Sequence, residues 1–169
     1  MHAPGTVLIH PAHGPMRVVS TTDLRFPNGE THECLNLEAI DTHALRVTIP
    51  VDQYDTSGLR SVVSGEAADE LFGTLSDPTE EESENWSRRY KANEQKMRSG
   101  SVLSLAEVVR DLLRRDEMKH LSLGERRTLA QGMSQLAREV FYSKDLESMA
   151  AAERLIKDAA LSMTPVGSA

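Results

Sequence analysis

The sequence predicts an α+β protein of two domains, a small β-barrel followed by an all-helical domain. Residues 1–50 contain short runs of alternating or β-branched residues separated by Pro, Gly, Asn and Asp, which is typical of strands and turns. From Glu66 onward, apolar residues recur at the three- and four-residue spacing of amphipathic helices. A chain of 169 residues is long enough to bury the core of one ordinary domain or of two small ones.

The strands are expected in four runs, and so many short strands in so few residues indicate a small barrel of the SH3 or Tudor kind. Asn28-Gly29 lies between two of the runs and is a strong hairpin signal. Alternation places Leu35 and Leu37 on one face of their strand, and the next strand repeats the pattern. The four runs are 6–9, 15–22, 32–39 and 44–50.

Helices are expected over 66–75 and 85–99, and three more should follow. Ser104 with Glu107 and Ser122 with Glu125 have the spacing of capping boxes, which predicts that one helix begins after each serine. Apolar stripes follow both serines, and a last helix should use residues 146–160. The expected organisation is a barrel domain at 1–55, a linker at 56–64, a helical domain at 65–163 and a frayed tail at 164–169.

Several features predict a cytoplasmic protein without a membrane partner. No apolar run approaches the roughly 18 residues that span a bilayer, and the N-terminus lacks the pattern of a signal peptide. Cys34 is the single cysteine, which suits a reducing compartment. The chain is expected to be a monomer.

The charge is distributed in blocks. The chain carries a formal net charge of −7. Residues 86–127, in contrast, hold 11 Lys/Arg against 6 Asp/Glu, a net +5. A cationic block inside an acidic chain indicates an anionic partner for that block, or a set of solvated helix faces with opposite charges at i+4.

Enzymatic or metal chemistry is not expected. His10 with His13 and His32 with Cys34 have short spacings, but a structural zinc site needs four clustered ligands. The sequence lacks the glycine-rich phosphate loops and the G-x-S-x-G nucleophile motif. The carboxylates at 80–84 are expected to form a solvated acidic surface. We therefore expect no cofactor, no metal and no catalytic residue.

The only tryptophan, Trp86, heads the cationic block, and two interpretations compete. A lone Trp is usually part of a core, which would leave the neighbouring charges facing water. Alternatively, the indole belongs to the surface, together with Arg88, Arg89 and Lys91. Aromatic rings interleaved with cations suit nucleic acid, because cations neutralise phosphates while rings stack on or insert between bases.

The string NWSRRYKANEQKMRSGSVLSLAEVVRDLLRRDEMKHLSLGERRTLAQ at 85–131 closely resembles the helical domain of the CarD/CdnL family of bacterial transcription regulators. GTVLIHPAHG at 5–14 and the Ile-Pro at 49–50 resemble the family's N-terminal domain. That domain type also occurs in the transcription-repair coupling factor, but this chain has no helicase motor. The resemblance covers roughly residues 5–160.

The resemblance implies a non-enzymatic factor that binds RNA polymerase through its Tudor-like domain, on the β subunit. The helical domain would contact promoter DNA at the upstream edge of the melted bubble, independently of sequence. Trp86 matches the family's Trp that enters the minor groove and hinders bubble collapse. Arg88, Arg89, Lys91 and Arg126 would contact the DNA. An aromatic wedge anchored by cations is physically suited to hold unstacked DNA.

The resemblance also implies polymerase contacts by Arg25, Arg46 and Thr48, with one departure from the family pattern. Actinobacterial members carry an Arg two residues before the Pro that closes the strand, where this chain has Thr48. Arg46 could serve instead, because residues i and i+2 share a strand face. The alternative function is a polymerase-independent architectural or repair-associated DNA-binding protein.

Overall fold

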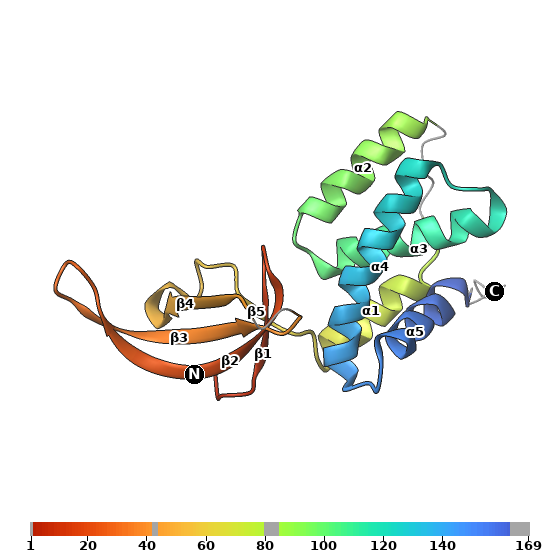
Figure 1. Ribbon diagram of the computed structural model, residues 1–169. Coiled ribbons are helices and arrows are strands. Elements are labelled where there is room, and N and C mark those ends of the chain that lie inside the picture. Colours follow the sequence, from red (N-terminus) through yellow and green to blue (C-terminus); the bar gives the residue numbers. More distant parts are fainter. Residues whose placement is uncertain (1, 42–43, 80–84, 163–169) are drawn as a thin grey trace. The chain divides into compact units, whose positions relative to one another are not determined.

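The computed structural model describes residues 2–41, 44–79 and 85–162 (Figure 1). The chain divides into two compact units, residues 1–62 and 63–169. The first unit contains all the described strands, and the second contains the five described α-helices. This is the predicted α+β class. The expected tail at 164–169 and the acidic segment 80–84 lie outside the described residues.

The described residues of the N-terminal unit form one antiparallel sheet of five strands in the order β4-β3-β2-β1-β5. Its central pair, β2 and β3, forms the long curved ribbon in Figure 1. The apolar faces predicted from alternation are confirmed, since Leu35 and Leu37 are buried and pair with Ile49 and Val47. The strands are β1 (Val7–His10), β2 (Gly14–Arg25), β3 (Thr31–Ala39), β4 (Arg46–Pro50) and β5 (Arg60–Ser61).

In the described residues the sheet is open, so the predicted small barrel of the SH3 or Tudor kind does not close. Closure would require β4 to pair with β5, but these strands lie at opposite edges of the sheet. The strand β5 has only two residues, which pair with β1. At the other edge Pro50 ends β4, and the chain turns into the short 3-10 helix η1 (Val51–Gln53).

Residues 56–62 of the segment 56–64, which the sequence assigns to a linker, belong to the N-terminal unit. Leu59 is buried in the core of the sheet, and β5 follows it directly. Gly58 has a φ of +74°, and a Cβ there would meet the Pro11 ring at 3.1 Å. A glycine is therefore required where this segment crosses the turn between β1 and β2.

The predicted hairpin at Asn28-Gly29 is confirmed, and it joins β2 to β3. The amide of Gly29 donates to the carbonyl of Phe26 at 2.9 Å, and the amide of Phe26 donates to Glu30 at 2.9 Å. Gly29 has a φ of +88°, so this is a three-residue loop that ends in a left-handed residue.

The described part of the C-terminal unit contains five α-helices. The capping box of Ser122 and Glu125 is confirmed at the start of α4. The one predicted for Ser104 and Glu107 was wrong, because Ser101 caps the helix and accepts from the amide of Ser104. The helices are α1 (Glu66–Ser76), α2 (Trp86–Arg98), α3 (Val102–Met118), α4 (Leu123–Lys144) and α5 (Met149–Leu161).

Two arginines of α3 bind the carboxyl ends of neighbouring helices. Arg110 donates to the carbonyl of Thr74 at 2.9 Å, in the last turn of α1. Arg114 donates to the carbonyl of Ala160 in α5 at 2.7 Å and to that of Asp77 after α1 at 2.6 Å. These carbonyls have no partner within their own helices, so the two guanidiniums join α1, α3 and α5.

The close approach of α3 and α4 depends on Gly132. Substitutions at Gly132 and at Gly73 should therefore change the stability in opposite directions. A Cβ at Gly132 would lie 3.0 Å from a Val109 methyl, whereas a Cβ at Gly73 of α1 meets nothing within 4 Å. Gly73→Ala should raise the free energy of unfolding by about 1 kcal/mol through helix propensity. Gly132→Leu should lower it by about 1–3 kcal/mol through overpacking. Urea denaturation of both variants tests this, and equal effects would contradict it.

Candidate nucleic-acid interface

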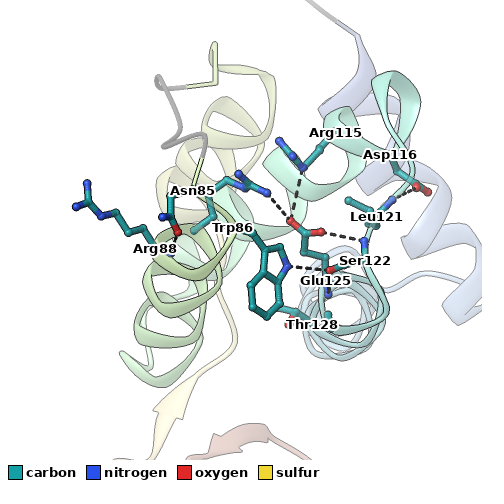
Figure 2. A network of polar contacts seen from close by, with 11 residues as sticks. Asn85, Trp86, Arg88, Arg115, Asp116, Leu121, Ser122, Glu125 and Thr128 are labelled. Atoms are coloured by element: carbon teal, nitrogen blue, oxygen red, sulfur yellow. Dashed lines mark hydrogen bonds and ion pairs between the residues drawn. The ribbon is translucent and has the colours of Figure 1, made fainter.

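The indole of Trp86 is held between α2 and α4 without being part of a core. Trp86 is the first residue of α2, and Asn85 caps this helix by accepting from the amide of Arg88. The indole Nε1 donates to the Ser122 hydroxyl at 3.0 Å, and the ring stacks on Tyr90 with 5.3 Å between centroids. Trp86 is nevertheless 46% exposed. One part of the ring is therefore fixed by the bond to Ser122 that Figure 2 shows, while another part is exposed to solvent.

Glu125 lies at the centre of a buried ionic cluster beneath this tryptophan. Its Oε1 accepts from Arg89 of α2 at 3.3 Å and lies 3.5 Å from Nε of Arg115 of α3. Its Oε2 accepts from the Ser122 amide at 2.9 Å, as a capping box requires. One carboxylate thus connects α2, α3 and α4 (Figure 2).

The pKa of Glu125 lies below its ordinary value, although two effects oppose each other. Burial, the largest single effect, raises the pKa by disfavouring the charged carboxylate. Hydrogen bonds from Ser122 and Arg89, together with the charge of Arg115, lower it and outweigh the burial. Glu125 is therefore ionised at neutral pH and neutralises part of the charge of the two guanidiniums.

The cations predicted to contact DNA fall into two groups. Arg88 and Lys91 of α2 and Arg126 of α4 are exposed, and Figure 2 shows Arg88 pointing away from the cluster. Arg89, in contrast, is 7% exposed and faces Glu125. The structure therefore places Arg88, Lys91 and Arg126 on the surface of the helices that hold Trp86, and Arg89 inside.

Other cations of the block have structural partners. Lys96 pairs with Glu107 at 2.6 Å, and Arg98 pairs with Glu94 at i,i−4 spacing. Arg110 and Arg114 bind helix ends, as described above. The interpretation of i,i+4 pairs on a solvated helix face is confirmed for Arg98, whereas Lys96, Arg110 and Arg114 have partners on other helices. The anionic partner stays a prediction.

Comparison with known proteins decides the family. The family model described as CarD, C-terminal domain, matches residues 70–157, which is more than half of the chain. The chain belongs to the CarD family. The resemblance inferred from the sequence is confirmed, and the matched region spans the whole site, from Trp86 to Glu125.

A relative of this CarD protein occurs in Bacillus subtilis (strain 168), under the name "Putative transcription factor YdeB". The two sequences are 26% identical over 125 residues, which cover 74% of this chain and 80% of the relative. The alignment is therefore longer than the C-terminal domain alone.

The polymerase-contact residues expected in the CarD protein lie at two places on the N-terminal sheet. Arg25 ends β2 and pairs with Thr31 beside the hairpin. Arg46 and Thr48 lie on the edge strand β4, opposite Glu38 and Asn36. Arg46 is 3.7 Å from Glu38, and the Thr48 hydroxyl donates to the Asn36 side chain at 2.9 Å. The structure thus brings Arg46 and Thr48 together but places Arg25 at the far end of the ribbon.

The described residues of this CarD protein contain no group of three His, Cys, Asp or Glu side chains that could hold a metal. His10, the last residue of β1, stacks on His13 in the turn that follows and accepts from the amide of Ala12 at 3.1 Å. Cys34 is buried, and burial raises the pKa of its thiol, with Asp52 and Asp23 adding to the effect. Within residues 2–41, 44–79 and 85–162, no helix combines the length and apolarity needed to cross a bilayer.

Sequence reasoning missed the residues that hold the indole. Ser122 was recognised only as a helix cap, and Gly124 was not considered. A Cβ at Gly124 would lie 3.2 Å from the Tyr90 ring and 3.7 Å from the Trp86 ring. The S-x-x-E spacing was visible in the sequence, but its contact with Trp86 spans 36 residues and has no local signature.

Proposed function

We propose that this CarD family member regulates transcription by binding the β subunit of RNA polymerase and promoter DNA together. The indole of Trp86 enters the minor groove at the upstream edge of the bubble and hinders reannealing. The chain acts without catalysis, as a monomer in the cytoplasm, and reaches the nucleoid through polymerase.

The observation that carries the proposal is the exposed part of the Trp86 ring between two cationic helices. An aromatic ring inserted at a base step keeps it unstacked, and cations that contact phosphates anchor the ring without reading sequence. Arg88, Lys91 and Arg126 supply those cations, because they are exposed on α2 and α4. Arg89 positions the site through Glu125 instead of contacting DNA.

Polymerase is required because the overall charge opposes binding to DNA. A net charge of −7 repels a polyanion at long range, so the free chain should bind duplex DNA weakly. The N-terminal sheet offers an edge strand for docking, β4, which carries the exposed Arg46. Edge strands recognise partners through main-chain hydrogen bonds, and side chains add specificity.

Binding to purified polymerase β subunit and the lifetime of the open promoter complex test the proposal. Arg46→Glu should weaken binding to the β subunit. The control is Lys157→Glu, which reverses the charge of an exposed lysine of α5 and should leave this binding unchanged. The wild-type chain should lengthen the open complex's lifetime. If the chain does not bind the β subunit but binds duplex DNA tightly by itself, it is instead the polymerase-independent architectural or repair-associated protein.

A further inference from the structure

Trp86 is fixed from three sides before any DNA is present. Its Nε1 donates to Ser122 Oγ at 3.0 Å, one ring face stacks on Tyr90, and its Cζ2 lies near Gly124, within 3.7 Å of where a Cβ would stand. Stacking and packing leave a ring free to slide in its plane. The hydrogen bond is the contact that fixes the direction of the indole.

The hydroxyl that receives this hydrogen bond is itself held in place. Ser122 Oγ accepts from the amide of Glu125 at 3.2 Å, and the Ser122 amide donates to Glu125 Oε2 at 2.9 Å. The Glu125 carboxylate is in turn fixed by Arg89 and Arg115. The Ser122 hydroxyl thus makes two hydrogen bonds. One caps α4 through the amide of Glu125, and the other holds the indole of Trp86.

We infer that Ser122 is a positioning residue, whose hydroxyl orients the indole of Trp86 for insertion into DNA. The inference rests on the proposed function, in which Trp86 contacts the promoter. A side chain that is already immobilised loses less entropy on binding, which is worth about two- to tenfold in affinity. Ser122 would thus lengthen the life of the open complex without touching DNA.

Two serine variants separate this role from simple helix capping. Ser122→Ala removes both the cap of α4 and the bond to the indole. Ser148→Ala removes only the cap of α5, where the serine accepts from the amide of Ala151 at 3.1 Å. Both variants should melt about 2–4 °C below wild type, since each loses a cap. Ser122→Thr keeps a hydroxyl and should behave like wild type.

The single tryptophan makes fluorescence a direct measurement of its position. In the full chain without DNA, Ser122→Ala should show stronger acrylamide quenching and lower anisotropy than Ser148→Ala. With polymerase on a promoter, the open-complex lifetime should fall about two- to tenfold for Ser122→Ala. It should stay at the wild-type value for Ser148→Ala and return there for Ser122→Thr. All variants should be measured at a temperature well below their melting temperatures, so that each is folded.

Each contrary outcome has a distinct meaning. Equal quenching and anisotropy in Ser122→Ala and Ser148→Ala would show that the hydroxyl does not position the ring, and would overturn the inference. A looser ring with an unchanged lifetime would overturn it too, provided that Trp86→Ala shortens the lifetime. If Trp86→Ala itself leaves the lifetime unchanged, the proposed function fails, and the role of Ser122 in it fails as well.

Discussion

Replacing Trp86 by Ala is expected to shorten the lifetime of the open promoter complex about five- to a hundredfold. The range corresponds to about 1–3 kcal/mol for the loss of one base-stacking ring. Binding to the polymerase β subunit should remain, because Trp86 lies in the C-terminal unit and the proposed docking residues lie in the N-terminal one. A decay assay on a preformed promoter complex measures the lifetime.

Folding should be affected much less by this substitution than by the loss of a core tryptophan. A buried Trp→Ala change costs about 3–5 kcal/mol, but Trp86 is 46% exposed, so roughly half of that loss is expected. Leu155→Ala is the matched control, since Leu155 is 39% exposed on α5. This variant should leave the lifetime at the wild-type value.

The exposed cations should affect the association of the polymerase complex with the promoter instead of the lifetime of the open complex. Arg88→Ala should weaken binding of the polymerase complex to the promoter and reduce the salt dependence by about one unit of slope. A Trp86→Ala chain that still gives wild-type lifetimes, measured at a temperature where the variant is folded, would exclude the wedge. Cations alone would then account for any DNA binding.

Replacing Glu125 by Ala is expected to lower the free energy of unfolding by about 3–5 kcal/mol. The change removes the carboxylate that Arg89, 7% exposed, and Arg115, 25% exposed, share, and breaking a buried ion pair by removing one member is strongly destabilising. It also breaks the capping box of α4. Urea denaturation followed by circular dichroism measures the loss of helix.

Glu107→Ala is the matched control for this prediction. Glu107 also pairs with a cation, Lys96, at 2.6 Å, but both side chains are more than one third exposed. Exposed ion pairs contribute about 0–1 kcal/mol, so this variant should unfold nearly as wild type does. Equal losses in the two variants would show that the Glu125 cluster contributes no more than a surface pair.

The contribution of Glu125 should also depend on pH. Its folded-state pKa lies below the ordinary value of 4.5, so the unfolded chain binds the proton more readily. The stabilisation is therefore fully present above about pH 5 and is lost as the pH falls through the folded-state value. The stability difference between wild type and Glu125→Gln should be constant from about pH 5 to 7 and shrink at lower pH. A difference that grows on acidification would contradict this sign.

The sequence by itself determined most of the secondary structure and the family. The hairpin at Asn28-Gly29, the alternation of Leu35 and Leu37, and the capping box of Ser122 are encoded in neighbouring residues. Local turn chemistry, periodicity and caps act over a few residues, so they can be recognised without a fold. The functional expectation came from the resemblance of residues 85–131 to the CarD/CdnL family, which is also read from the sequence without a fold.

Tertiary structure alone decided whether the sheet closes into a barrel and which cations are exposed on the surface. Whether β4 meets β5 depends on the path of the chain after Pro50, which strand propensity does not describe. Arg88 and Arg89 are adjacent and chemically identical, yet only Arg89 faces Glu125, a residue 36 positions away. The same separation joins Trp86 to Ser122. Contacts between distant segments depend on how helices pack, and packing assigns each side chain to the interior or to the surface.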